Sequence, residues 1–292
     1  AHSRMGARHR RAIGQEAIAP GERDESSGVG KRGGRDKAGR RCGIGERGNG
    51  RELTVRIAGL QKLTLLDFPG KTAATVFTPG CNFRCPFCHN ADLVTGPATR
   101  AGSHEGDLSA ADVLAFLEKR RGLLDGVCLT GGEPVIQPDL ADFCARVRDL
   151  GFAVKLDTNG GFPDRLRALA EANLVDYVAM DVKNAPERYA KTVGASMLDL
   201  APIEESMEVL RAGSVPFEFR TTVTRELHAP DDLRALARWI GDAPAWFLQN
   251  YRDAESVLGG AGRLHPWNAD ELRAPADELR ASAPGIALRG MD

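Results

Sequence analysis

The sequence predicts an α/β protein in which six strand–helix units form a partial, open (β/α)6 barrel. From Ala73 onward, short runs of β-branched and apolar residues alternate with longer stretches of helical period, the pattern of parallel sheets covered by helices. Six units are too few to close an eight-stranded barrel but enough for an open, curved one. The expected strands are Ala73–Thr78, Gly126–Thr130, Ala153–Asp157, Val175–Asp181, Phe217–Val223 and Ala245–Gln249.

Helical stretches lie between these strands, and several begin with residues that commonly start helices, such as Ser, Asp and Pro. In the first of them, Val113, Phe116 and Leu117 fall on one helical face. We expect polar motifs at the C-terminal ends of the strands, because barrels of this type place their chemistry there. The expected helices are Ser109–Gly122, Pro138–Leu150, Pro163–Ala172, Ile203–Ala212 and Pro230–Ile240.

Composition favours a soluble globular protein that binds a metal. The 292 residues are 42% hydrophobic and carry a formal net charge of −1, which allows a sizeable core. No apolar run is long enough to span a membrane and none near the start resembles a secretion signal, so we expect a cytoplasmic location and no membrane partner. In such a chain, cysteines favour metal binding over disulfides; they are Cys42, Cys81, Cys85, Cys88, Cys128 and Cys144.

The first 51 residues differ from the rest, with 13 Lys+Arg against 6 Asp+Glu, compared with 26 against 34 afterwards. This Arg- and Gly-rich segment lacks an apolar period and cannot offset its ordering entropy, so we expect residues 1–51 to be disordered and 52–292 to fold. Interspersed acidic residues disfavour a nucleic-acid tail or a transit peptide. Because the composition changes abruptly and the chain begins with Ala1, we hypothesise that this leader is not part of the native protein.

Three cysteines follow the first expected strand with the spacing C-x3-C-x2-C, in the segment TPGCNFRCPFCHN that ends at Asn90. A [4Fe–4S] cluster normally takes four cysteines, so three thiolates leave one iron open to a substrate. A zinc site would need a fourth ligand, usually from a second pair, and none is present. Cys128 and Cys144 are expected to be small core residues. We therefore predict one [4Fe–4S] cluster on Cys81, Cys85 and Cys88.

Polar motifs follow the next three expected strands: GGEP from Gly131, DTNG from Asp157, and MDVK ending at Lys183. Glycine allows a close backbone approach, and Glu133 could then bind an ammonium group beside it. Each motif alone could be an ordinary turn or a solvated strand end. Together they place acidic and basic groups around one mouth.

The cysteine spacing, with the aromatic Phe87 before the third cysteine, resembles the signature of the radical S-adenosylmethionine superfamily. The resemblance implies that the amino and carboxylate groups of S-adenosylmethionine bind the fourth iron, and that reductive cleavage yields a 5′-deoxyadenosyl radical that abstracts hydrogen. It also implies a set of cofactor contacts, with Phe87 near the adenine, Glu133 at the methionyl amine, and acidic or basic groups at the ribose and carboxylate: Phe87, Gly131, Gly132, Glu133, Asp157, Thr158, Asp181 and Lys183.

The same resemblance allows a monovalent cation between Asp157 and Asp181. Arg220 is a weaker candidate, with a strand residue paired to an acid as the alternative. His228 and His265 lie beside Ala-Pro and Pro respectively, and we expect both on surface loops without a role.

Two further segments, LQKLTLLDFPGK from Leu60 to Lys71 and the CHN ending at Asn90, resemble activating enzymes of glycyl-radical enzymes. The first is most similar to the activating protein of anaerobic ribonucleoside-triphosphate reductase. The resemblance, which ends near Tyr251 and leaves the tail after Arg252 unassigned, implies an oxygen-sensitive enzyme that removes hydrogen from a glycine of that partner. An electron donor such as flavodoxin or ferredoxin is also implied, whereas a general base on this chain is not.

Two other function classes remain open. The first is a radical enzyme acting on a different glycyl-radical enzyme, such as one like pyruvate formate-lyase, or on a small molecule. The second is a non-catalytic zinc or iron–sulfur binding module, in which S-adenosylmethionine would not perturb the metal.

Overall fold

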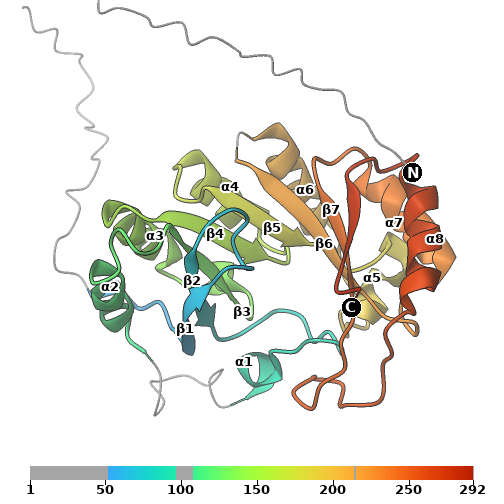
Figure 1. Cartoon of the computed structure of the whole chain (residues 1–292), viewed down its shortest axis with the longest axis horizontal. Helices are drawn as coiled ribbons and strands as arrows, with labels where there is room; N and C mark the ends of the chain where they lie inside the picture. The colour runs from blue at the N-terminus through green and yellow to red at the C-terminus, as the bar shows by residue number, and fades with distance from the viewer. Residues whose placement is uncertain (1–51, 97–107, 214, 292) are drawn as a thin grey trace, which may run out of the picture. The chain divides into compact units, whose positions relative to one another are not determined.

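The computed structural model describes residues 52–96, 108–213 and 215–291, so the segment 1–51 expected to be disordered lies outside the described residues. Eight strands form one sheet in the order β1 to β8 (Figure 1). β1 runs antiparallel to β2, and every other neighbouring pair is parallel. Because β1 and β8 are separate edges, the barrel is open, as predicted.

The strands are β1 (Gly59–Thr64), β2 (Ala73–Thr78), β3 (Gly126–Gly131), β4 (Ala153–Thr158), β5 (Tyr177–Asp181), β6 (Phe217–Val223), β7 (Trp246–Asn250) and β8 (Ile286–Arg289). The helices are α1 (Ala91–Thr95), α2 (Ala110–Glu118), α3 (Leu140–Asp149), α4 (Pro163–Glu171), α5 (Pro186–Thr192), α6 (Ala201–Ala212), α7 (Pro230–Ile240) and α8 (Ala269–Leu279), with a short 3-10 helix η2 (Pro134–Ile136). Within the described residues, no helix is long and apolar enough to cross a membrane.

The six predicted strands are β2 to β7, each with ends within two residues of those expected, and the five predicted helices are α2, α3, α4, α6 and α7. The strand count of six was too low, because β1 and β8 extend the sheet at its two edges. β1 exposes three consecutive residues and β8 has only four, so neither carries the buried apolar run that marks the inner strands.

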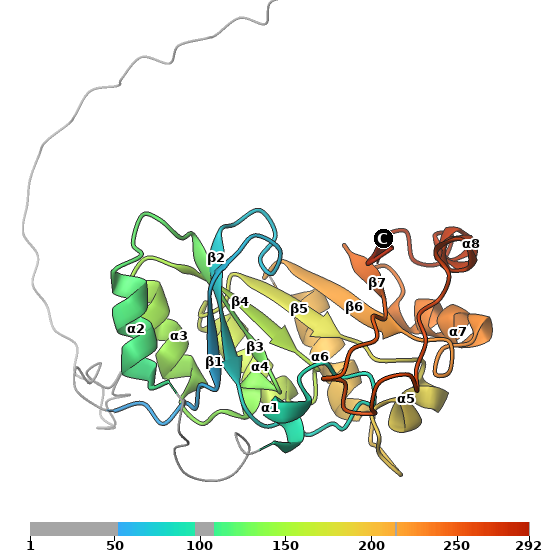
Figure 2. The same ribbon diagram turned by 60° about the horizontal axis from the view of Figure 1, so that its bottom comes forward.

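The core lies between the inner strands and the helices along the sheet (Figure 2). Val76, Leu129 and Leu156 on successive strands are fully buried, as expected for parallel strands covered on both faces. In α7, Leu233, Leu236, Ala237 and Ile240 form the buried face. Each large apolar side chain buried in this way contributes roughly 1.5–3 kcal/mol.

Local signals at the helix starts agree with this packing. α2 begins with a capping box in which the Ser109 hydroxyl accepts from the Asp112 amide at 3.1 Å and the Asp112 carboxylate accepts from Ser109. α4, α5, α6 and α7 each have proline in the first turn, where its missing N–H costs nothing. These signals set where the five helices begin.

The segment 60–71 forms β1 and the connection to β2. Since β1 is antiparallel to β2, this connection lies at the N-terminal edge of the parallel strands, away from the loops that follow them. Asp67 accepts a hydrogen bond from the Thr75 hydroxyl at 2.6 Å, and Phe68 is 3% exposed. The residues that carry the finer family resemblance therefore support the edge of the sheet.

Candidate functional site

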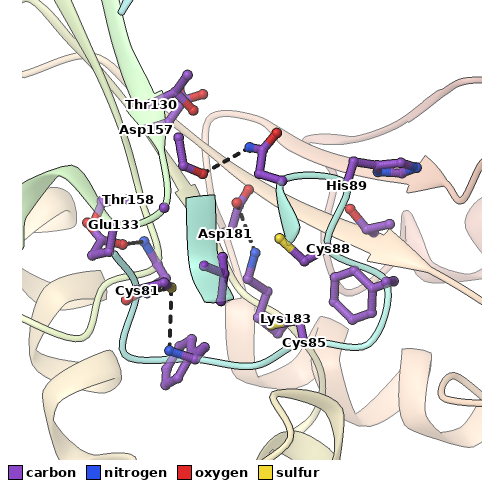
Figure 3. A pocket seen from close by; sticks show the side chains of 18 residues that line it. Cys81, Cys85, Cys88, His89, Thr130, Glu133, Asp157, Thr158, Asp181 and Lys183 are labelled. Atoms are coloured by element: carbon purple, nitrogen blue, oxygen red, sulfur yellow. Dashed lines mark hydrogen bonds and ion pairs between the residues drawn. The ribbon is translucent and has the colours of Figure 1, made fainter. Parts of the chain in front are cut away.

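One pocket opens at the C-terminal ends of β3, β4 and β5, with an empty volume of about 800 Å³ that includes its open mouth (Figure 3). All eleven predicted site residues line it. A volume of this order suits a cofactor-sized ligand. The lining consists of Cys81, Phe83, Cys85, Phe87, Cys88, His89, Asn90, Val94, Thr130, Gly131, Gly132, Glu133, Asp157, Thr158, Asn159, Asp181, Lys183 and Thr222.

The loop that carries the three cysteines, residues 79–90, follows β2 and is here called the cysteine loop. It is held from three directions. Gly80 donates its amide to the Leu93 carbonyl of α1 at 2.7 Å, and Arg84 donates to the Val193 carbonyl at 2.9 Å. On the third side, the segment after β7 donates from Leu258 to the Cys88 carbonyl at 2.9 Å and from Gly259 to the Pro86 carbonyl at 2.8 Å. The loop is thus anchored by elements distant in sequence.

His89 adds a further anchor to the same loop. Its Nε2 lies 2.6 Å from the Arg252 carbonyl oxygen, and its ring stacks on Tyr251. The segment after β7, which the sequence left unassigned, therefore supports the cysteine loop.

The three thiols line the pocket separately, with Cys81 on one side and Cys85 and Cys88 on the other (Figure 3). Within the described residues, no three His, Cys, Asp or Glu side chains are grouped so that they could hold a metal ion. The separated thiols fit a cluster in which each thiolate binds a different iron. Burial raises the pKa of Cys85 to about 12 and also raises the pKa of Cys81, so metal binding would have to displace these protons.

The two glycines after β3 allow two loops to approach each other. Gly131 has a φ of 119°, and a Cβ there would lie 2.4 Å from the Thr78 carbonyl oxygen. A Cβ on Gly132 would lie 1.9 Å from the Gly80 carbonyl oxygen. The glycines thus seat the GGEP loop against the cysteine loop, whereas the sequence suggested only an approach to a ligand.

Glu133 is 1% exposed, and its carboxylate accepts hydrogen bonds from three donors. The backbone amide of Asn159 donates to Oε2 at 2.6 Å. The Thr158 hydroxyl donates to Oε1 at 2.8 Å, and the backbone amide of Val135 donates to the same oxygen at 3.3 Å. Burial nevertheless raises the pKa of Glu133 to about 7, and among the described residues no cationic side chain forms an ion pair with it. A cationic ligand such as an ammonium group would supply the missing charge.

Five charged side chains form a network on the floor of the site. Arg220 binds Asp181 at 2.7 Å and Asp157 at 3.3 Å; Lys155 pairs with Asp157, and Lys183 with Asp181. Burial acts to raise the pKa of Asp181, but Arg220 and Lys183 outweigh it and hold this pKa below its usual range. Arg220 is therefore a strand residue paired with acids, the alternative considered for it above.

Lys183 also faces Phe87, whose ring centroid lies 5.9 Å from Nζ. Burial opposes the charge of Lys183, yet Asp181 raises its pKa above the ordinary lysine value. Of the three cations in this network, Lys183 lines the pocket, where its ammonium group could meet an anionic group of a ligand.

Sequence reasoning missed several lining residues, among them Asn90, Asn159 and Thr222. Asn90 donates to the Gly131 carbonyl at 2.9 Å and so joins the cysteine loop to the GGEP loop. Asn159 contacts both the Glu133 carboxylate and the Cys81 sulfur. Both residues stand inside motifs quoted from the sequence, and their position beside assigned residues was the available signal.

The remaining candidates outside the pocket divide into two outcomes. Cys128 and Cys144 are fully buried, as expected for core residues, and His265 is exposed and paired with Glu226. The surface position expected for His228 was wrong: it is 0% exposed, accepts from the Thr224 amide at 3.2 Å and lies 2.9 Å from the Lys183 carbonyl oxygen. It supports the backbone that carries Lys183.

Comparison with known proteins assigns the chain to a family. A family profile described as the Radical SAM superfamily matches residues 75–240, more than half of the chain. The chain belongs to the radical S-adenosylmethionine superfamily. Members of this superfamily use a [4Fe–4S] cluster and S-adenosylmethionine, and so does this protein. The three thiols, the buried Glu133 carboxylate and the Lys183 ammonium group fit these groups.

Two relatives align over most of this radical S-adenosylmethionine protein. A protein of Methanocaldococcus jannaschii, named provisionally as a glycyl-radical enzyme activating enzyme, is 27% identical over 76% of this chain and 90% of its own length. The pyruvate formate-lyase-activating enzyme of Listeria monocytogenes is 27% identical over 79% of this chain and 92% of its own length.

Solved structures share the fold at low identity. TYW1 with a lysine-pyruvate adduct bound has a TM-score of 0.54 and 14% identity, and covers 72% of this chain and 74% of its own. Streptococcus suis SuiB bound to S-adenosylmethionine has a TM-score of 0.53 and 14% identity, over 72% of this chain and 48% of its own. These likenesses support the fold alone.

Proposed function

We propose that this radical S-adenosylmethionine protein activates a glycyl-radical enzyme by removing a hydrogen atom from a glycine Cα of that partner. The observation that carries the proposal is the similarity to the two relatives named for such activation, which extends over 90% and 92% of their lengths. The partner we propose is anaerobic ribonucleoside-triphosphate reductase, on the resemblance of the segment 60–71. That segment supports the sheet edge and not the pocket, so the partner needs its own test.

The site residues take the roles that their contacts allow. Cys81, Cys85 and Cys88 would hold the cluster, and Glu133 would orient the ammonium group of S-adenosylmethionine. Together the bound cluster and S-adenosylmethionine supply a carbon-centred radical able to abstract hydrogen. Phe87 and Lys183 line the same wall and would exclude water from it.

The remaining predicted contacts are Gly131, Gly132, Asp157, Thr158 and Asp181. The two glycines would keep the backbone close to the ligand, while the charged network would place its ribose and carboxylate. No general base is assigned on this chain.

The geometry of the mouth supports a macromolecular substrate. The pocket shares Asp181, His89 and Thr222 with a second hollow, of about 1180 Å³ including open solvent, that continues along β7 and β8. Arg252 and Arg289 lie on this second hollow. An extended loop of a partner could enter along this second hollow. We further propose that a flavodoxin- or ferredoxin-like donor reduces the cluster in the cytoplasm.

The proposal is tested by anaerobic reconstitution with iron and sulfide, followed by reduction with S-adenosylmethionine present. We expect 5′-deoxyadenosine from the wild type and none from Cys85→Ala, with Cys144→Ala as the matched buried-cysteine control. Adding anaerobic ribonucleoside-triphosphate reductase should then give a glycyl-radical signal by electron paramagnetic resonance.

Other results of this experiment have distinct meanings. A radical on pyruvate formate-lyase instead of the reductase would keep the activating role and replace the partner. A small-molecule substrate has local support, because 7-carboxy-7-deazaguanine synthase of Methanopyrus kandleri is 34% identical over 40% of this chain and 51% of its own length. Formation of 5′-deoxyadenosine without a radical on either enzyme would favour that class.

A further inference from the structure

The orientation of the Asn159 side-chain amide is determined by its neighbours. Its Oδ1 accepts from the Gly161 backbone amide at 2.9 Å, so Nδ2 must point the other way. The two Nδ2 hydrogens then have two acceptors, the Asn82 Oδ1 at 2.7 Å and the Cys81 Sγ at 3.7 Å. Asn159 is 5% exposed, so water competes little for these bonds.

Cys81 therefore differs from the other two cysteines of the loop. Its sulfur accepts from Nδ2 of Asn159 and from the backbone amide of Phe83 at 3.4 Å. In the part of the chain that the structure describes, no corresponding N–H donor reaches the sulfur of Cys85 or Cys88. The hydrogen bonds to the ligand sulfurs are thus concentrated on one side of the pocket, the side of Glu133 (Figure 3).

We propose that Asn159 is a positioning residue whose side-chain amide, by donating to the Cys81 sulfur, makes the bound cluster easier to reduce. Hydrogen bonds to the sulfurs are among the factors that set iron–sulfur reduction potentials. The reduced cluster carries one more negative charge, so a donor to its ligand stabilises the reduced form more than the oxidised form. The inference rests on the superfamily assignment and is independent of which partner enzyme is activated.

The same residue joins the two halves of the site. The Asn159 backbone amide donates to Glu133, while its side chain reaches Cys81. A side-chain substitution removes the second contact and leaves the first in place. The redox effect can therefore be separated from the binding of S-adenosylmethionine at Glu133.

The test is a redox titration of the anaerobically reconstituted protein, followed by electron paramagnetic resonance. We expect Asn159→Ala to have a more negative potential, so that the ratio of reduced to oxidised cluster at a fixed applied potential falls by about three- to tenfold. A tenfold fall corresponds to about 59 mV for a one-electron couple. Asn159→Asp, which keeps an acceptor for Gly161 but places negative charge at the sulfur, should shift further.

Asn82→Ala is the matched control, because it keeps the donor to Cys81 while removing the amide bridge between the two asparagines, together with the Asn82 Oδ1 that lies 3.8 Å from the Cys81 sulfur. Its potential should not become more negative than that of the wild type. Gly161→Ala supplies a second route, since its Cβ would lie 2.7 Å from Asn82 Nδ2 and 2.9 Å from Asn159 Oδ1, and should displace the amide. We expect the same negative shift.

Wild-type potentials in both Asn159→Asp and Gly161→Ala would overturn the proposal, even if Asn159→Ala failed to take up a full cluster. An equal shift in Asn82→Ala would also overturn it, because the effect would then come from loop geometry. Failure of the wild type to assemble any cluster would instead contradict the cofactor assignment.

Discussion

At the scale of single residues, the site separates ion-paired carboxylates from one whose hydrogen-bond donors are neutral. Asp181 contacts Arg220 and Lys183, which keep its pKa low despite burial. Glu133 is more deeply buried, at 1% exposed against 28% for the Asp181 side chain, its hydrogen-bond donors are neutral, and burial raises its pKa to about 7. A buried carboxylate of this kind gains most from a cationic ligand. This contrast supports the proposed role of Glu133 at the ammonium group of S-adenosylmethionine.

We therefore predict that Glu133→Gln weakens S-adenosylmethionine binding. The substitution keeps one carbonyl oxygen, which can accept from the Asn159 backbone amide, and an NH2 group that can donate to the Thr158 hydroxyl, but it removes the charge proposed to face the ammonium group. Hydrogen bonds to charged groups contribute about 1.5–3 kcal/mol, or roughly ten- to a hundredfold in affinity. Equilibrium binding to the anaerobically reconstituted protein measures this. The control is Asp142→Asn on the exposed side of α3. Unchanged affinity in Glu133→Gln would place the ammonium group elsewhere.

His228 predicts a pH dependence of stability. Burial lowers its pKa below the ordinary value of 6.5, so the folded protein keeps it neutral while the unfolded chain takes up a proton as pH falls. Stability contributed by His228 is therefore present above pH 6.5 and is lost as pH falls below it, by up to about 1.4 kcal/mol per pH unit.

Urea unfolding of the cluster-free wild type and of His228→Gln at several pH values between about 5.5 and 7.5 checks this dependence. The introduced glutamine side chain is uncharged throughout this range, so the variant should show a smaller loss on acidification. It should also be destabilised at neutral pH by about 1–3 kcal/mol, because the Thr224 amide loses its acceptor. Parallel pH profiles in the two proteins would be incompatible with a buried neutral His228.

At the scale of elements, local sequence was sufficient where a strand and its following motif are adjacent in the chain. The strands β2 to β5 and the motifs at their ends follow from apolar runs that stop at polar or glycine residues. Contacts between loops could not be read in this way, because they depend on packing between distant segments. The bond from Asn90 to Gly131 and the cover of Leu258 and Gly259 over the cysteine loop are of this kind.

The segment after β7 gives a prediction at this scale. Gly259 donates to the Pro86 carbonyl oxygen, and a Cβ on Gly259 would lie 2.8 Å from that oxygen. Gly259→Ala should therefore lift the segment from the cysteine loop and expose the cluster. We expect bleaching of the reconstituted protein in air to be severalfold faster than in the wild type, whereas Ala261→Ser, at an exposed position in the same segment, should match the wild type. Equal bleaching rates would show that the segment gives no protection.

At the scale of the whole molecule, the last strand is joined to β6 and β5 through one buried carboxylate and to β7 through a cation–π contact. Glu218 on β6 is 1% exposed. Its carboxylate accepts hydrogen bonds from two guanidinium nitrogens of Arg289 on β8, at 3.0 and 3.1 Å, and from the Tyr177 hydroxyl on β5 at 2.9 Å. Arg289 also lies over the Phe247 ring of β7, with its guanidinium carbon 3.3 Å from the ring centroid. The tail after Arg252 is thus part of the sheet, which no local pattern in its four-residue strand indicated.

Removing Arg289 should consequently destabilise the entire sheet. Arg289→Ala leaves the Glu218 charge buried without its cation, which costs several kcal/mol at fully buried sites; since Arg289 is 37% exposed, we expect about 1–3 kcal/mol. Arg289→Lys should recover little of this, because an ammonium group cannot form the two parallel bonds. Urea unfolding measures each loss, with Arg273→Ala on exposed α8 as a control that should cost less than about 0.5 kcal/mol.

Combining Arg289→Ala with Glu218→Gln should cost less than the sum of the single changes, because the unpaired charge is then absent. Strict additivity would mean that the two residues stabilise the sheet independently.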